Sequence, residues 1–256
     1  MRVGYVKTSC VMTAKELGRN RFALVLLVVI PMLFFTLVSL TTSEHPVAFR
    51  LASVSEDTIV QVSARNESLL FIGVAAVGLL SSFLALNLIQ RNAAVNRRLI
   101  LCGFRSSELI LAKLSVLLLA VLVISLYVGL LLLVFFRPEH FVNVVLGFVL
   151  AGFVHLCYGL LVGTTVKREL EGILLIVLLV NIDAGWLQNP VYYAEAQNKL
   201  LIRWLPAYFP SQASIVSAFT DHSIFSSFIG SVAYGALLLI AALLIYWWRM
   251  RVVRPR

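Results

Sequence analysis

Three polar side chains lie within or at the end of long apolar stretches of this sequence: His155, Asn181 and Asp183. Polar groups in an apolar environment are costly and often functional, so each is a candidate for lining a pathway. His155 could contact a substrate or relay a proton. We favour a neutral histidine that hydrogen-bonds a neighbouring helix, because no acidic residue lies clearly at its depth. Asn181 and Asp183 either line the exit of a pathway or cap a break in the helix.

The sequence contains no recognisable motif for catalysis or metal binding. It has no G-x-S-x-G nucleophile turn, no H-E-x-x-H zinc helix and no G-x-x-x-x-G-K-[ST] phosphate loop. The three cysteines form no CxxC pair, and no two of His45, His140 and His222 have the spacing of metal ligands on one helix. We therefore expect no catalytic residue, metal or cofactor in this chain.

The composition indicates a membrane protein. Hydrophobic residues make up 61% of the 256 residues and charged residues only 13%, and the mean hydropathy is +0.96. Soluble domains use charge on about a quarter of their residues. A net charge of +9 could suggest nucleic-acid binding, but the basic residues lie beside apolar segments rather than in a soluble basic domain, so we expect no nucleic-acid partner.

Six apolar segments are long enough, or nearly so, to cross a bilayer. The fifth has 16 residues and would reach only about 24 Å as a helix, short of the roughly 30 Å hydrocarbon core. We therefore predict one all-α domain over residues 1–256, with six transmembrane helices at residues 22–40, 69–89, 109–136, 141–166, 172–187 and 224–248.

The distribution of Lys and Arg predicts the orientation of these helices. Sixteen of the 21 basic residues fall on one side of the predicted membrane and five on the other. Because cytoplasmic loops carry the excess of basic residues, the first side is the cytoplasm. Both termini then lie in the cytoplasm. An even number of crossings agrees with this, because it places both termini on the same side.

Residues 1–21 are predicted to form an amphipathic helix in the membrane interface. Val6, Cys10, Ala14 and Leu17 recur at helical spacing, with charged residues such as Lys15 opposite them. The alternative is a solvated basic tail that only follows the charge rule.

The outer region, residues 184–223, is predicted to contain a re-entrant segment. Residues 200–219 are apolar, but Pro206 and Pro210 interrupt the helix. Broken helices survive at membrane depth only when they are buried in protein. Trp204 suits the headgroup zone. An ordinary aromatic-rich outer loop is the alternative.

The connection between the second and third apolar segments, residues 91–105, is longer and more charged than a simple turn requires. Its sequence predicts a helix that ends at Gly103 and a new helix capped by Ser106, with Glu108 in the first turn. We therefore expect a structured cytoplasmic helix that another protein can grip.

In layout and in this connection, the chain resembles the membrane subunits of type-2 ATP-binding-cassette (ABC) exporters, which have the ABCG-like transmembrane fold. Pro206 and Pro210 match the prolines of the family's outer segment. The chain departs from the family at residues 94–97, Ala-Val-Asn-Arg, where many members have Gly-Thr-x-Glu. The resemblance implies a coupling helix whose contact residues are Arg97, Arg98, Leu99, Gly103, Phe104, Arg105 and Glu108.

The resemblance also implies partners. Two copies of a separate ATPase subunit, which holds ATP and Mg, would drive transport, and a second permease copy or a sister permease would complete the pathway in contact with membrane lipids. It implies a multi-pass plasma-membrane location, in bacteria the inner membrane, and no enzymatic activity in this chain. A secondary transporter, or an intramembrane enzyme acting on a lipid-like substrate, is the alternative function.

Overall fold

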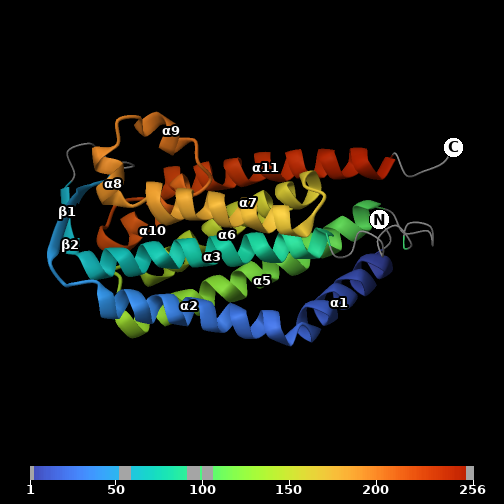
Figure 1. Ribbon diagram of the computed structural model, residues 1–256, viewed down its shortest axis with the longest axis horizontal. Coiled ribbons are helices and arrows are strands. Elements are labelled where there is room, and N and C mark those ends of the chain that lie inside the picture. Colours follow the sequence, from blue (N-terminus) through green and yellow to red (C-terminus); the bar gives the residue numbers. More distant parts are fainter. Residues whose placement is uncertain (1–2, 52–58, 91–98, 100–105, 252–256) are drawn as a thin grey trace.

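The protein forms an elongated bundle of helices, 83% helical, with one small sheet (Figure 1). The computed structural model describes residues 3–51, 59–90, 99 and 106–251. Six helical segments have the length and apolar composition of membrane crossings: Leu24–Thr41, Ala64–Gln90, Glu108–Phe135, Phe141–Thr165, Glu169–Leu187 and Phe225–Trp248. The chain is therefore a multi-pass membrane protein. All six predicted segments are confirmed to within five residues at each end.

The helices follow each other up and down the bundle (Figure 1). Their residues are almost uncharged, and at about 1.5 Å per residue the longer ones exceed the roughly 30 Å hydrocarbon core. The bounds of the long helices are α1 (Val3–Arg19), α2 (Arg21–Thr41), α3 (Ala64–Gln90), α5 (Ser106–Phe135), α6 (Phe141–Thr165), α7 (Glu169–Ile182) and α11 (Phe225–Arg251).

The two ends of the bundle differ. At the hairpin end lie an antiparallel pair of strands, with Pro46 opposite Ser63 and Arg50 opposite Ile59, and the short helices that follow α7. At the opposite end, the α1 end, α1 meets α2 at an angle (Figure 1). The remaining bounds are β1 (Pro46–Arg50), β2 (Ile59–Ser63), η1 (Asp183–Leu187), α8 (Pro190–Glu195), α9 (Lys199–Arg203) and α10 (Tyr208–Phe219).

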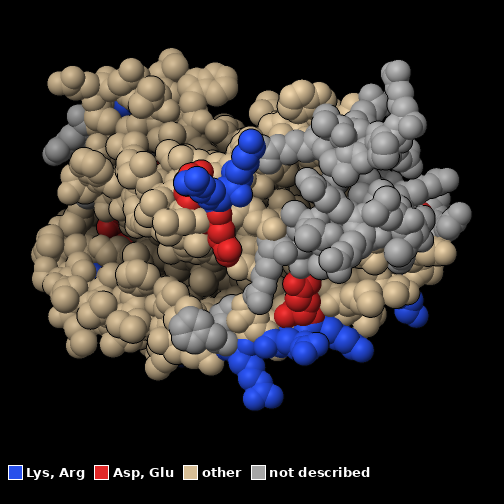
Figure 2. Space-filling model, turned by 45° about the vertical axis from the view of Figure 1, so that its right-hand side comes forward, with Lys and Arg blue, Asp and Glu red and all other residues tan. Residues whose placement is uncertain are grey.

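Charged side chains gather at the α1 end. Figure 2 brings this end toward the viewer and shows one group over α1 and another over the turn between α6 and α7. Lys167 and Arg168 of that turn are exposed, and Arg168 Nη1 lies 3.7 Å from Glu171 Oε1. Exposed pairs of this kind add little stability, so their value lies in keeping this end in water.

Helix α6 is the centre of the bundle, in contact with α3, α5, α7, α10 and α11. It approaches two of them very closely through glycines. A Cβ atom at Gly159 would collide with the backbone of Ser82 on α3, and one at Gly147 would collide with Ser214 on α10. Small residues allow helices in membranes to pack this tightly, because dispersion contacts replace the hydrophobic effect there.

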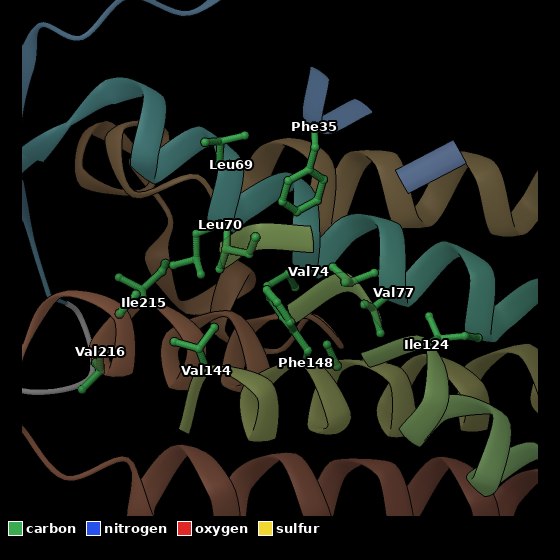
Figure 3. Close-up of a cluster of buried hydrophobic side chains, with 14 of the residues drawn as sticks. Phe35, Leu69, Leu70, Val74, Val77, Ile124, Val144, Phe148, Ile215 and Val216 are labelled. Carbon is green, nitrogen blue, oxygen red and sulfur yellow. The ribbon is translucent and has the colours of Figure 1, made fainter. Parts of the chain in front are cut away.

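The largest core cluster lies toward the hairpin end, where α2, α3, α5, α6 and α10 meet. Figure 3 shows Val74 of α3 beside Phe148 of α6 in this cluster. The Phe148 ring lies against Gly73, and Phe35 of α2 is fully buried with its ring centroid 6.0 Å from that of Phe135. Phe35 thus attaches the half of α2 nearer the hairpin end to the core, although most of α2 is exposed.

The predicted N-terminal helix is confirmed, and of its expected apolar stripe Val6, Cys10 and Leu17 are half-buried while Ala14 is exposed. Its place in the membrane interface stays a prediction. In α1 the buried residues are Ser9 and Thr13, whereas Ala14 is exposed and Met12 is 61% exposed. The reason is that α1 packs along α5, where the Cys10 thiol lies 3.7 Å from the Ala112 carbonyl oxygen. Small side chains suit this helix contact better than the apolar stripe does.

The close approach at Gly159 can be tested by adding one methyl group. We expect Gly159→Ala to lower the free energy of unfolding by about 1–3 kcal/mol, because the methyl group forces α3 and α6 apart. Gly18→Ala is the matched control: a Cβ atom there meets nothing within 4 Å, so it should gain up to about 1 kcal/mol of helix propensity. Unfolding in detergent measures both, and equal effects would contradict the packing described above.

Candidate functional site

The candidate site at the hairpin end is built around Asp183, where the helix of the fifth crossing changes form. α7 ends at Ile182, and Asp183–Leu187 continue as one turn of π-helix. Such turns are rare and often occur at functional sites. Asp183 is only 4% exposed. Its Oδ1 accepts a hydrogen bond from Gln188 Nε2 at 2.8 Å, and its Oδ2 accepts one from the Ala207 backbone N–H at 2.7 Å.

These two bonds connect the end of the fifth crossing to the start of α10. Ala207 precedes the first residue of α10, and Gln188 Nε2 also lies 3.4 Å from the Ile202 carbonyl oxygen of α9. The Asp183 carboxylate therefore holds the α9–α10 turn against the π-turn. Among the described residues it has no ion-pair partner, so these N–H donors are what stabilise it.

Two buried polar atoms in this region have no hydrogen-bond partner among the described residues. They are Gln188 Oε1 and the hydroxyl of Tyr158, which are both buried. Tyr158 is close enough to feel the charge of Asp183. Buried polar groups are normally satisfied, so this spot can accept or donate a hydrogen bond to a further polar group. Among the described residues, this site offers no nucleophile paired with a general base for covalent chemistry.

The segment after the fifth crossing is interrupted at Pro206, as the sequence predicts, but not at Pro210. α9 ends at Arg203 and α10 begins at Tyr208, with Pro206 in the turn between them. Pro210 is the third residue of α10, where a missing N–H costs nothing, and it is buried. Trp204 is 72% exposed, and its carbonyl oxygen accepts a hydrogen bond from the Tyr234 hydroxyl of α11 at 2.9 Å.

A cluster of tyrosines stabilises the turn between α9 and α10. Arg203 Nε donates to the Tyr193 hydroxyl at 3.0 Å, and the rings of Tyr193 and Tyr208 have centroids 6.0 Å apart. Burial raises the pKa of Tyr208 to about 12, so this phenol stays neutral at physiological pH. Together with Asp183, this cluster makes α8–α10 a packed unit rather than a loose loop.

The structure separates the two polar residues that the sequence groups together. Asp183 faces the bundle, but Asn181 is exposed and its Nδ2 donates to the Val177 carbonyl oxygen of its own helix at 2.7 Å. Residues i and i+2 of a helix point about 200° apart around its axis. When Asp183 faces the bundle, Asn181 therefore faces outward. Only Asp183 belongs to the buried site.

His155 is buried, with 1% of its surface exposed. Its Nδ1 lies 2.9 Å from the Ala151 carbonyl oxygen of its own helix, and its ring lies against Gly78 of α3. Its carbonyl oxygen accepts a hydrogen bond from the Ser82 hydroxyl at 2.8 Å. The hydrogen bond of the His155 ring is thus within α6, whereas the interpretation favoured from the sequence is a bond to a neighbouring helix.

The candidate site at the α1 end is the junction of α1, α3 and α5 around Lys113. This lysine is 5% exposed, and its Nζ donates to the Leu88 carbonyl oxygen in the last turn of α3 at 3.2 Å. A cation at the C-terminal end of a helix is favourable. Glu16 of α1 attracts the same ammonium group, and Glu108, in the first turn of α5, is 1% exposed.

This junction borders the predicted coupling region. The α5 helix begins at Ser106 with Glu108 in its first turn, as the sequence predicts. Leu99 is partly buried. The other predicted contact residues lie outside the described residues: Arg97, Arg98, Gly103, Phe104 and Arg105.

Lys113 and Glu67 are not among the site residues expected from the sequence, yet both are buried in helices long enough to cross a membrane. Glu67 is 5% exposed, and its Oε1 has no hydrogen-bond partner among the described residues. The signal for Glu67 is its helical phase, because it shares a face with Leu70 and Val74 of the core. For Lys113, the signal is its position one turn inside an apolar segment.

A third group of polar residues lies at the hairpin end, on the surface. His140 Nε2 lies 2.7 Å from Asp221 Oδ1, and Glu139 is near enough for the three to offer ligand atoms within 4.8 Å of one another. All three are exposed. The pair ties the α5–α6 connection to the α10–α11 connection. The backbone N–H groups of Glu139 and His140 also donate to carbonyl oxygens of α10.

Comparison with known proteins identifies no relative: no protein-family model matches the chain, and no curated protein is similar to it.

The role of Asp183 can be tested by truncation. We expect Asp183→Ala to leave the Ala207 N–H and the Gln188 amide unpaired, at about 1–3 kcal/mol each. Local opening at the hairpin end should follow, seen as faster hydrogen exchange in α9 and α10. Asn181→Ala, two residues away but exposed, should leave exchange unchanged. Slow exchange in Asp183→Ala would contradict a stabilising role.

Proposed function

We propose that this chain is the membrane subunit of an ABC exporter, driven by a separate ATPase subunit that binds residues 91–105. The observation that carries this proposal is the buried contact between Lys113 Nζ and the Leu88 carbonyl oxygen. It joins α5 to the last turn of α3, and these are the two helices that the 91–105 connection links. A force applied to this connection would therefore move both helices together.

The α1 junction extends this unit to the N-terminal helix. Glu16 attracts Lys113 and Cys10 contacts Ala112, so α1 follows α5 when α5 moves. We propose that α1 lies in the cytoplasmic interface of the plasma membrane, in bacteria the inner membrane, with both termini in the cytoplasm. The exposed basic residues of α1 and of the α6–α7 turn support this orientation.

We propose further that the α8–α10 unit is re-entrant and forms the outer gate of the pathway. Ten of the twelve residues of α10 are buried, although the helix is too short to cross a bilayer. The Asp183 carboxylate holds its start, and among the described residues Gln188 Oε1 and the Tyr158 hydroxyl are buried without a hydrogen-bond partner. One bundle forms half of the pathway, and a second copy or a sister permease forms the other half.

The alternative functions find less support at Asp183 and His155, the polar residues that the sequence singles out. An ion-coupled secondary transporter needs an acidic group that can bind and release its ion. Both Asp183 oxygens already accept hydrogen bonds from the protein. An intramembrane enzyme needs a nucleophile and a base within reach of one another, and the ring of His155 is bonded to its own helix.

The proposal predicts co-purification with an ATPase. The full-length chain, isolated from its native membrane, should retain a subunit with ATPase motifs, and Arg98→Glu should reduce the retained amount by about tenfold or more, as expected when a contact charge is reversed. Arg137→Glu is the matched control, since Arg137 is exposed at the hairpin end. Transport or catalysis by the lone chain, without any ATPase bound, would overturn the proposal.

A further inference from the structure

A cavity of about 300 Å³ lies beside the joint between α1 and α2. One wall is α2, from Leu24 to Ile30, and the other is α3, from Leu80 to Leu88. It exists because α2 is attached to the bundle mainly in its other half, through Phe35. Of the residues in Leu24–Thr41, only 11% are buried, so this cavity lies on the lipid-facing side of the bundle.

The cavity is amphipathic along its length. Its polar lining residues, Glu16, Asn20 and Asn87, lie at the α1 end, and the part toward the middle of α2 and α3 is lined by aliphatic side chains and Phe83. From Leu80 to Leu88 the wall is about 12 Å long, close to the roughly 15 Å of one hydrocarbon leaflet. The shape therefore suits a single chain that enters from the interface.

The size is also sufficient for a bound hydrocarbon. An apolar cavity of about 150 Å³ holds benzene, and this cavity has about twice that volume. Ligand pockets begin at about 300 Å³. An aliphatic groove of this kind at membrane depth is in contact with acyl chains from the bilayer itself.

The charges at the polar end favour an anionic head. Arg19 is the last residue of α1 and Arg21 the first of α2, so they flank Asn20, which lines the cavity. Both are exposed, as is Lys15. Glu16 is the one acidic residue among positions 15–21, and Lys113 attracts it. The net charge around the mouth is therefore positive, and guanidinium groups bind phosphate well.

We propose that this cavity binds one acyl chain of an anionic phospholipid, with the lipid phosphate held by Arg19 and Arg21. The site is distinct from the proposed pathway at the hairpin end: its walls are α2 and α3, at the joint between α1 and α2. A bound lipid would fill the gap between α2 and α3 and stabilise that joint. The proposal rests on the membrane character of the helices and does not depend on an ATPase partner.

The test uses the purified full-length chain in phosphatidylcholine vesicles that contain a photoactivatable phospholipid with a diazirine in its acyl chain. We expect the phosphatidylglycerol probe to crosslink to Leu80–Leu88 of α3 about tenfold more than the phosphatidylcholine probe, given two basic contacts. Arg19→Gln with Arg21→Gln should remove this preference. Lys7→Gln, on the exposed surface of α1, should keep it.

A cavity-filling variant tests the chain-binding part separately. Leu24→Trp should reduce crosslinking to α3 about tenfold because the indole occupies the cavity, whereas Val29→Trp should not, since Val29 is exposed to a similar extent on the same helix but is not among the lining residues. The proposal would be overturned by equal crosslinking over all exposed helices or by an equal loss in both Trp variants. Absence of crosslinking to α3, as expected if a protein helix fills the cavity and excludes the probe, would also overturn it.

Discussion

In a chain with this little charge, the polar groups at membrane depth must find their partners inside the protein, because hydrocarbon offers none. This constraint explains the most specific contacts of the structure. Lys113 donates to a carbonyl at the end of α3, Ser82 donates to the backbone of α6, and Asp183 accepts bonds from two donors. Each of these bonds joins two elements, so satisfying polar groups and fixing the arrangement of helices are the same event.

The two ends of the bundle use this constraint differently. At the hairpin end, a carboxylate and a pair of tyrosines hold three short helices as one unit. Two buried oxygens there, of Tyr158 and Gln188, have no hydrogen-bond partner in the described part of the chain. At the α1 end, a lysine ties three helices together directly beside the 91–105 connection. Between the ends, glycines of α6 bring the helices into close contact. The centre of the bundle is therefore closely packed, and polar contacts join the helices at both ends.

Much of the fold could be predicted from the sequence, because the absence of charge over about 20 residues is a strong signal for a membrane crossing. The start of α5 at Ser106 followed from local capping rules. The burial of Ser9 and Thr13 in α1 could not be predicted, since it depends on these small side chains fitting against α5. Which of Asn181 and Asp183 faces the bundle could not be predicted either, because it depends on how α7 is rotated about its axis where the π-turn begins. Glu67 was missed because its burial depends on neighbouring helices.

The central claim is that the chain crosses the membrane six times with the α1 end in the cytoplasm. Single cysteines in a cysteine-free background test it most directly, with a membrane-impermeant maleimide applied to intact cells or, for a bacterial protein, to spheroplasts. Asp221→Cys, at the hairpin end, should be labelled without permeabilisation, and Lys167→Cys, at the α1 end, only after it. Both positions are exposed, so burial cannot mask either result. Labelling of Lys167→Cys from outside would contradict the account.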